Sequence, residues 1–401
     1  MQPTNQPSED FCYRAVCSRD ARFDGRFYAA VVTTGIYCRP LCPAVTPQRR
    51  HVRFYPCAAA AEEAGYRPCR RCRPDAAPGA PAWLGTTATV RRDGAPIPVA
   101  GEGLGLRLPV RTPYDWNSLI AFLAPRAIPG VEQVTPDSYR RSVLVDGAPH
   151  YIEVTFEPEP PRLVFCVRPP LTRGLIEVVE RIKALFDADA DPLPIDDHLR
   201  RDAGLARLVR ARPGLRVPGA WDGFELGVRA ILGQQISVAG ATTLAGRLAQ
   251  AFGARTPDET SGATRLFPTA ERLAEADIAK IGLPGARARA LSGFAREIAE
   301  SCLSLSPAAP IEETRTRLLA IPGLGPWTVE YVALRALRDP DAFPAGDLGL
   351  RRALSVEGTL VSEKELRERS EAWRPWRAYA AMHLWTSLSS TVSRKKHARS
   401  S

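Results

Sequence analysis

A turn rich in glycine and proline sets the strongest limit on how this chain folds. Residues 319–328 read Leu-Ala-Ile-Pro-Gly-Leu-Gly-Pro-Trp-Thr, and a helical pattern continues through Trp327, Tyr331 and Leu334. The pattern predicts two helices joined by a short hairpin, with main-chain N–H groups at the start of the second helix open to an anion such as phosphate. A helix end followed by a turn without any ligand explains these residues equally well.

The composition favours a polyanionic partner. The chain has 401 residues, enough for two or three domains, and a formal net charge of +10. Its 45% hydrophobic and 24% charged residues are typical of a soluble globular protein. We find no signal peptide and no apolar run of membrane-spanning length, so we expect a cytoplasmic protein that binds no membrane.

Seven of the nine cysteines lie in the N-terminal part, and four of them have the spacing of a metal site. Cys38 and Cys42 form one close pair, and Cys69 and Cys72 form another. Two such pairs can place four thiolates tetrahedrally around one Zn²⁺. Eight arginines against three acidic residues between positions 38 and 75 would form a basic surface for a phosphate backbone. On these residues alone, a purely structural zinc module is the simpler explanation.

A family resemblance adds a reaction to this metal site. Gly35-Ile-Tyr-Cys-Arg-Pro-Leu-Cys-Pro, Val52-Arg-Phe-Tyr and Gly65-Tyr-Arg-Pro-Cys-Arg-Arg-Cys resemble the N-terminal zinc domain of the Ada adaptive-response proteins. The resemblance implies that Cys38, a zinc ligand, irreversibly takes a methyl group from a methylated phosphate of DNA. Zinc keeps such a thiol deprotonated, and the thiolate is the nucleophile. We therefore expect residues 1–75 to form a small zinc-bound α+β module.

The next segments change character twice. Residues 76–108 have the Ala, Gly and Pro content of a linker, and are too short for the AraC-type helix-turn-helix that Ada-like proteins usually carry at this point. Residues 109–190 contain β-rich runs and a hairpin turn at Asp146-Gly147, followed by a helical pattern. These patterns predict an α+β domain with an antiparallel sheet.

Residues 191–390 show a helical pattern, and residues 391–401 form a basic tail that would add nonspecific affinity for DNA. The expected helices after residue 230 span 237–252, 271–280, 286–300, 312–320, 327–338, 348–354, 364–373 and 376–388. Asp347 stands immediately before one of them, and by itself it is most simply the N-cap residue of that helix.

A second resemblance covers roughly residues 109–390. Ala230-Ile-Leu-Gly-Gln-Gln-Ile-Ser, the turn at 319–328 and the segment from Trp373 to Trp385 resemble the 3-methyladenine DNA glycosylase II (AlkA) group of the helix-hairpin-helix superfamily. The resemblance implies an all-α glycosylase domain behind an AlkA-like α+β domain. The enzyme would release alkylated purines such as 3-methyladenine by hydrolysis of the N-glycosidic bond.

The resemblance assigns roles to an aspartate and three aromatic residues. Asp347 would be the catalytic carboxylate, and Trp327, Tyr331 and Trp385 would form the base pocket. Trp327 and Tyr331 are four residues apart and share a helix face, although core packing explains that pattern as well. An aromatic cleft attracts a cationic alkylated base that has left the duplex. The carboxylate would then stabilise the oxocarbenium-like sugar.

The resemblance also implies contacts with DNA and with a monovalent cation, Na⁺ or K⁺. The implied DNA-binding residues are Gln234, Gln235, Gly323, Leu324, Gly325 and Thr328. The cation would be bound by the main-chain carbonyls of Leu319, Ile321 and Leu324. Gln235 and Leu348 replace a leucine and an aromatic residue of the bacterial pattern, so the range of excised bases stays open.

Two other functions compete with this interpretation. A glycosylase/lyase of the endonuclease III type needs an amine in the hairpin, but Trp327 stands there and no lysine lies between Lys280 and Lys364. Its iron–sulfur cluster is excluded because Cys302 is the last cysteine. A non-enzymatic regulator would use the zinc module and the hairpin only for DNA affinity. We expect a monomeric enzyme of the bacterial nucleoid, acting on double-stranded DNA with alkylated bases or methylated phosphates.

Overall fold

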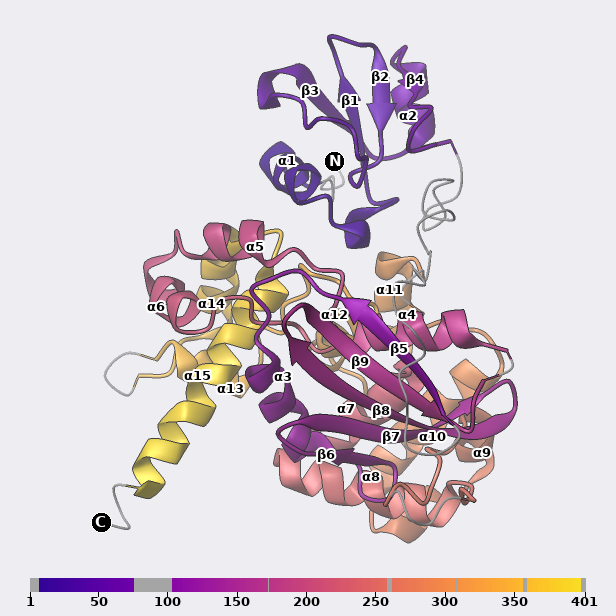
Figure 1. Cartoon of the computed structure of the whole chain (residues 1–401). Coiled ribbons are helices and arrows are strands. Elements are labelled where there is room, and N and C mark those ends of the chain that lie inside the picture. Colours follow the sequence, from indigo (N-terminus) through magenta and orange to yellow (C-terminus); the bar gives the residue numbers. More distant parts are fainter. Residues whose placement is uncertain are drawn as a thin grey trace. The chain divides into compact units, whose positions relative to one another are not determined.

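The computed structural model describes residues 7–75, 103–171, 173–257, 262–306, 309–355 and 359–397, with side chains up to residue 388. The chain divides into an N-terminal unit and a larger C-terminal unit (Figure 1). Within the described residues, no helix is long and apolar enough to cross a membrane. Most of the predicted linker, residues 76–102, lies outside the described residues.

The N-terminal unit is a four-stranded sheet with a helix on each face. The strand order is β3-β1-β2-β4, and only the β2–β4 pair is parallel. Its elements are α1 (Glu9–Ser18), η1 (Ala21–Phe23), β1 (Tyr28–Val31), β2 (Ile36–Cys38), η2 (Arg49–His51), β3 (Val52–Tyr55), α2 (Ala58–Glu63) and β4 (Arg67–Pro68). The predicted α+β module is therefore confirmed.

Alternation along β1 explains why both faces of this sheet are covered. Ala29 packs with Phe11 of α1, whereas Tyr28 and Ala30 pack with Ala61 of α2. Successive strand residues point to opposite faces, so the two small cores lie on opposite sides of one sheet. Of the other cysteines in this unit, Cys12 is a buried core thiol, and Cys17 and Cys57 are exposed.

The larger unit begins with a five-stranded antiparallel sheet in the order β5-β9-β8-β7-β6 (Figure 1). The elements of this part are β5 (Leu104–Pro109), α3 (Trp116–Leu123), η3 (Ala124–Arg126), β6 (Glu132–Val134), β7 (Ser138–Val145), β8 (Ala148–Pro158), β9 (Pro161–Arg168) and α4 (Leu175–Leu185). The predicted β-rich runs form strands of this sheet, and the β7–β8 turn lies at Asp146-Gly147, where both residues have positive φ. The sequence interpretation missed β5, α3 and β6.

The C-terminal boundary of the predicted linker was wrong. Residues 104–108 pair with β9 as the edge strand β5, from Leu104 opposite Val167 to Leu108 opposite Leu163. The glycines around them suggested a linker, but Leu104, Leu106 and Leu108 alternate with the period of a strand.

The rest of the unit is helical. Its elements are α5 (Pro192–Leu199), α6 (Ala203–Ala211), α7 (Gly223–Leu232), α8 (Val238–Phe252), α9 (Ala270–Glu275), η4 (Ile278–Ile281), α10 (Gly285–Ala299), α11 (Ile311–Ala320), α12 (Pro326–Arg335), α13 (Leu348–Ala353), α14 (Glu363–Ser370), η5 (Glu371–Trp373) and α15 (Arg377–His397). The last predicted helix, 376–388, ends too early, because α15 continues to His397 and so includes residues 391–397 of the predicted basic tail. The helical (i, i+4) hydrogen bonds of the backbone do not require apolar side chains.

A buried ion network joins the sheet to α7. Arg141 of β7 contacts Glu225 of α7 at 2.6 Å, and Arg229 of α7 contacts Glu132 of β6 at 3.0 Å. Tyr139 donates a hydrogen bond of 2.5 Å to Glu132. Leaving any one of these charges buried without its partner costs roughly 3–5 kcal/mol. The network therefore fixes how α7, which precedes the Gln234-Gln235 loop, sits on the sheet.

Candidate active site and zinc centre

Asp347 is the N-cap of α13, as its position before that helix predicts. Its Oδ1 accepts a hydrogen bond from the main-chain N–H of Leu350 at 2.9 Å. The same oxygen accepts the indole N–H of Trp385 at 2.9 Å, and Oδ2 accepts that of Trp327 at 2.9 Å. Two indoles from α12 and α15 thus hold one half-buried carboxylate in a fixed orientation, which a capping role alone does not require.

The aromatic residues predicted for the base pocket do come together. Trp327 and Tyr331 stack with ring centroids 5.5 Å apart and an interplanar angle of 15°. Trp385 meets Tyr331 edge to face at 6.2 Å. The rings of Trp327, Tyr331 and Trp385 therefore form one group beside Asp347. Such a group offers both stacking and cation–π attraction to a flat cationic base.

Sequence reasoning missed three members of this neighbourhood. Phe122 of α3 lies 6.4 Å from Trp385, and the guanidinium of Arg126 lies over the Phe122 ring at 3.7 Å. On α12, Arg335 donates from Nη1 to the hydroxyl of Tyr331 at 2.9 Å. Arg335 stands four residues after Tyr331, so helical spacing was a signal for it. Phe122 and Arg126 come from a distant segment, and no sequence signal pointed to them.

Gly349 keeps the space beside the carboxylate open. A Cβ atom at this position would lie 2.9 Å from Oδ1 of Asp347 and 3.4 Å from Cδ1 of Trp385. Contacts under 3.0 Å force a neighbouring atom to move. A glycine is therefore required on α13 if the carboxylate and the indole are to keep this geometry.

The predicted hairpin lies between α11 and α12. Gly323 has φ +92°, and a Cβ on it would come within 2.7 Å of the Cβ of Ala290 on α10. Gly325 is the N-cap of α12 and gives no side-chain cap. The first turn of α12 therefore leaves main-chain N–H groups without a side-chain partner, as an anion-binding helix start does. The side chains of Leu324 and Thr328 are buried, so these two residues would have to contact DNA through their main chain.

Gln234 connects the α7–α8 loop to the hairpin through hydrogen bonds of its side chain. Its Nε2 donates to the carbonyl of Gly323 at 2.9 Å and to Oγ1 of Thr328 at 3.0 Å. Its own carbonyl accepts from Arg287 at 2.7 Å. The next residue, Gln235, is exposed and has φ +58°, a conformation that costs a non-glycine residue about 1 kcal/mol or more. The structure thus presents Gln235 on a firmly held loop beside the hairpin.

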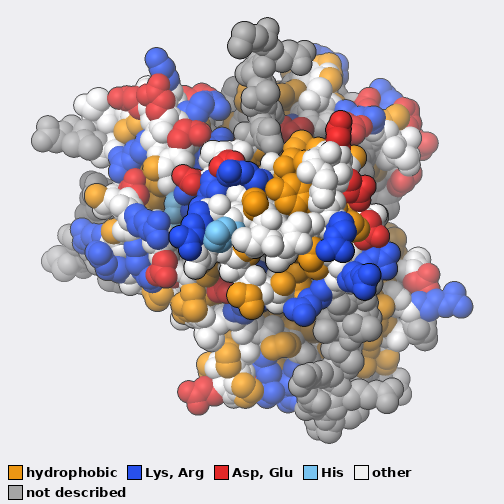
Figure 2. All heavy atoms as spheres, turned by 90° about the horizontal axis from the view of Figure 1, so that it is seen from above, with side chains coloured by type: hydrophobic (Ala, Val, Ile, Leu, Met, Phe, Trp, Pro, Cys, Tyr) orange, Lys and Arg blue, Asp and Glu red, His pale blue; other side chains and the backbone are white. Residues whose placement is uncertain are grey.

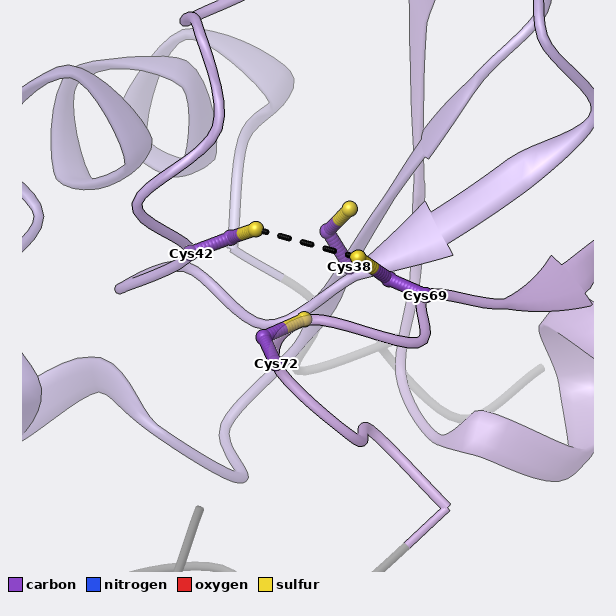
Figure 3. A group of neighbouring side chains, drawn as sticks. All are labelled: Cys38, Cys42, Cys69 and Cys72. Atoms are coloured by element: carbon purple, nitrogen blue, oxygen red, sulfur yellow. Dashed lines mark hydrogen bonds between the residues drawn. The ribbon is translucent and has the colours of Figure 1, made fainter. Parts of the chain in front are cut away.

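The four predicted zinc ligands converge in the N-terminal unit (Figure 3). The sulfur atoms of Cys38, Cys42, Cys69 and Cys72 all lie within 4.8 Å of one another, and those of Cys42 and Cys69 are 4.0 Å apart. Tetrahedral Zn–S bonds of about 2.3 Å place the sulfurs about 3.8 Å apart. The donor set and its spacing therefore fit Zn²⁺. Cys38 and Cys69 are half-buried, whereas Cys42 and Cys72 are buried.

Hydrogen bonds between these thiols shift their pKa values in opposite directions. Hydrogen bonds from Cys38 and Cys72 lower the pKa of Cys42 to about 2. The same contact with Cys42 raises the pKa of Cys38. One thiolate is thus stabilised by its neighbours, and a dication is needed before all four sulfurs carry charge together.

One residue of the predicted basic surface turns inward. Arg39 is buried, forms an ion pair with Asp24 at 2.8 Å and donates to the carbonyl of Arg73. Its main-chain N–H donates to the sulfur of Cys72 at 3.4 Å. Arg67, Arg70 and others around the cluster remain exposed. On the face of the molecule in Figure 2, basic side chains gather in several groups with acidic ones between them.

Comparison with known families accounts for three stretches of the chain. Residues 11–75 match the metal binding domain of Ada. Residues 105–222 match the AlkA N-terminal domain, and residues 228–377 match the HhH-GPD superfamily of base excision DNA repair proteins. The second match begins inside β5, in agreement with the strand found there.

Similar proteins cover the same stretches. A probable bifunctional transcriptional activator/DNA repair enzyme AlkA of Mycobacterium tuberculosis is 35% identical over 96% of this chain and 98% of its own length. The DNA-3-methyladenine glycosylase 2 of Escherichia coli is 36% identical over 68% of this chain and 94% of its own length. A solved 3-methyladenine DNA glycosylase of Archaeoglobus fulgidus shares the fold, with a TM-score of 0.62 and 24% identity over 70% of this chain and 97% of its own.

Proposed function

Because the chain belongs to the family of bifunctional Ada/AlkA-type DNA repair proteins, we propose that it repairs alkylated DNA by two separate reactions. The larger unit is a monofunctional DNA-3-methyladenine glycosylase II that hydrolyses N-glycosidic bonds of alkylated purines. The zinc unit accepts methyl groups from methylated phosphates. The observation that carries the first reaction is the convergence of Trp327, Trp385 and the α13 N-terminus on the Asp347 carboxylate.

The Asp347 carboxylate suits a reaction that develops positive charge on a sugar. Alkylation at N3 or N7 makes the purine cationic and a good leaving group. As the C1′–N bond breaks, the electron pair goes to the base, and the sugar becomes an oxocarbenium-like cation. Asp347 stabilises that cation and orients the water that adds to C1′. Because the two indole N–H groups already hold the carboxylate, it needs little reorganisation during the reaction.

The hairpin fits the role of an anchor for duplex DNA. The main chain at Gly323 and Gly325 would hold a phosphate near the flipped nucleotide, and Gln235 would enter the gap left in the duplex. Carbonyls of Leu319, Ile321 and Leu324 would share Na⁺ or K⁺ with that phosphate. The Ile321 carbonyl also accepts the N–H of Leu324 at 3.1 Å, which leaves one lone pair for a cation. The proposal includes a monomeric protein acting on alkylated duplex DNA.

The second reaction uses Cys38. When bound, zinc would hold the cluster sulfurs as thiolates at neutral pH. The Cys38 sulfur then attacks the methyl carbon of a methylphosphotriester. An S–C bond forms, the C–O bond breaks, and the phosphodiester leaves with the electron pair. Cys38 is one of only two half-buried ligands among the four, so a phosphate can approach it more readily than Cys42 or Cys72.

The Asp347→Asn variant tests the glycosylase. Asparagine is a good N-cap residue, so α13 is kept, but the negative charge is lost. We expect release of 3-methyladenine from methylated duplex DNA to fall roughly 10²-fold or more. Asp191→Asn, at the N-cap of α5, makes the same chemical change away from the site and should release base normally. Wild-type release by Asp347→Asn would refute the assigned role. No release by wild-type protein would favour a non-enzymatic regulator.

Mass spectrometry tests the methyl transfer. After incubation with DNA that carries methylphosphotriesters, the zinc-loaded protein should gain one methyl group on the peptide with Cys38. Cys69→Ser removes the other half-buried ligand and so distinguishes the sulfur of Cys38 from that of Cys69 as the methyl acceptor. Cys57→Ser removes an exposed thiol outside the cluster. Methylation should persist in Cys57→Ser. A methyl group on Cys69 instead would refute the role given to Cys38, and no methylation of wild-type protein would leave the cluster a structural zinc site.

A further inference from the structure

Two guanidinium groups beside the aromatic side chains lack a carboxylate partner among the described residues. Arg335 is 3% exposed, and its Nε and Nη2 donate to the carbonyls of Pro218 and Gly219 at 2.8 and 2.7 Å. Arg126 donates to the carbonyl of Phe122 at 2.8 Å and lies over that ring. By contrast, Arg229 is paired with the carboxylate of Glu132. Burying a cation without a counter-charge is costly, so a negative or electron-rich group is expected nearby.

The hydroxyl of Tyr331 is that group. It accepts a hydrogen bond from Nη1 of Arg335 at 2.9 Å, and Arg335 also lies over the Tyr331 ring at 5.7 Å. Within the described part of the chain, no acceptor is found for the phenol proton of Tyr331 itself. That proton can therefore be donated to a bound base, or be lost to solvent so that a phenolate faces Arg335.

We propose that Tyr331 adjusts the charge of the base pocket, as a phenol for neutral damaged bases and as a phenolate for cationic ones. As a phenol, it donates a hydrogen bond to an acceptor atom of the base. As a phenolate paired with Arg335, it attracts a positively charged alkylated purine. Arg335 is the positioning residue that makes both forms accessible. The proposal rests on the proposed glycosylase function and adds a determinant of its substrate choice.

The surrounding charges support a phenolate at mildly alkaline pH. Burial raises the pKa of Tyr331, but Arg335, Arg126 and Arg229 together bring it down to about 8. The other charged groups near it are already engaged. Glu132 of β6 and Glu225 of α7 pair with Arg229, and Asp347 at the start of α13 is held by the two indoles. The phenol therefore predominates below pH 8 and the phenolate above it.

An absorbance titration of the full-length protein tests the ionisation without any reference to activity. We expect a tyrosinate signal of one residue to appear near pH 8 in wild-type protein and to be missing in Tyr331→Phe, while ordinary tyrosines ionise near pH 10. Arg335→Met should move this step upward. Tyr114→Phe is the matched control, because Tyr114 also has an arginine over its ring at 4.6 Å but donates its proton to the carbonyl of Phe186. If no Tyr331-dependent step appears below about pH 9.5, the proposal is wrong.

Base release tests the consequence. The ratio of single-turnover release rates for 3-methyladenine, a cationic lesion, and hypoxanthine, a neutral one, is measured in duplex DNA from pH 6.5 to 9. We expect the ratio to rise about tenfold through pH 8 in wild-type protein, equal to about 1.4 kcal/mol, and more weakly in Tyr331→Phe. Because Tyr331→Phe lacks the phenol, the pH dependence that remains in this variant includes the titration of the damaged bases themselves. An identical pH profile in both proteins overturns the proposal. Release of neither base by wild-type protein would refute the glycosylase, and the absorbance titration would still decide the ionisation.

Discussion

At the scale of single residues, the proposed chemistry depends on atoms that three separate segments bring to one carboxylate. Trp327 and Trp385 lie 20 and 38 residues from Asp347 in the sequence, and each directs an indole N–H to a different oxygen. Asp347 also caps α13 through the oxygen that Trp385 contacts. Local sequence could predict the cap, because it needs only the aspartate and the helix after it. The indole contacts depend on how α12 and α15 pack.

Gly349→Ala is expected to separate helix stability from catalysis. Alanine favours a helix over glycine by about 1 kcal/mol, so α13 should not be destabilised by the backbone change. Its Cβ would nevertheless press on Oδ1 of Asp347 at 2.9 Å and shift the carboxylate or Trp385. We expect release of 3-methyladenine to fall about tenfold, with thermal stability unchanged or slightly raised, since small displacements of reacting groups slow catalysis strongly.

Gly293→Ala on α10 is the control for that substitution. Its Cβ would find only Cγ2 of Ile321, at 4.0 Å. The control should keep the wild-type rate of base release. A Gly349→Ala protein as active as wild type would show that the carboxylate tolerates the displacement.

At the scale of elements, the helices and strands with a strong local sequence pattern could be predicted, and those with a weak pattern were missed. The helices flanking the hairpin were predicted because Gly and Pro mark their ends and apolar residues recur along α12. β5 was missed, because Gly101, Gly103 and Gly105 outweighed three alternating leucines. The end of α15 was missed for a similar reason, since Arg394, Lys395 and Lys396 form no amphipathic pattern. Phe122 and Arg126 could not be assigned to the site, because no local rule relates α3 to α12.

After Tyr331, the buried imidazole of His383 on α15 is a second group whose ionisation can be tested. His383 is 2% exposed, and neither ring nitrogen has a hydrogen-bond partner among the described residues. Burial, together with the charges of Arg212 and Arg200, lowers the pKa of His383 to about 3. The folded protein keeps this imidazole neutral, while the unfolded chain protonates it near pH 6.5. Between these pH values the unfolded state binds more protons, so acid destabilises the fold.

His383→Leu should therefore reduce the acid sensitivity of the larger unit. Each pH unit below about 6.5 costs wild-type protein about 1.4 kcal/mol through this one group. At pH 5 the wild type should lose about 2 kcal/mol more unfolding free energy, relative to pH 7, than the variant does. Urea unfolding at both pH values measures this difference. The same substitution at His150, which is more exposed on β8, is the control. Equal losses in wild type and His383→Leu would show that His383 is protonated in the folded state.

At the scale of the whole molecule, two units with different chemistry follow one another in a single chain. The zinc unit has its own sheet and two small cores, and the larger unit has a sheet, an ion network and the helices that bear the site. The family matches at 11–75, 105–222 and 228–377 follow the same division. Each unit therefore contains every described residue that its proposed reaction uses.

This division predicts that base release survives without the zinc unit, provided that β5 is kept. A fragment of residues 103–401 should release 3-methyladenine at the rate of the full chain. A fragment of residues 109–401, which starts where the linker was predicted to end, loses five of the six paired residues of β5, including three half-buried leucines. We expect its unfolding free energy to be lower by about 2–4 kcal/mol. Removal of β5 also exposes the edge of β9, which favours aggregation.

Urea unfolding, size-exclusion chromatography and base release on the two fragments distinguish these effects. Replacing Leu104, Leu106 and Leu108 together by serine in fragment 103–401 keeps the chain length and removes the apolar contacts. This variant should fall between the two fragments in stability, because its main chain can still pair with β9. If fragment 109–401 equals fragment 103–401 in stability and activity, β5 contributes nothing to the fold. If fragment 103–401 is stable but releases no base, the glycosylase needs the zinc unit, and the predicted independence of the two units is wrong.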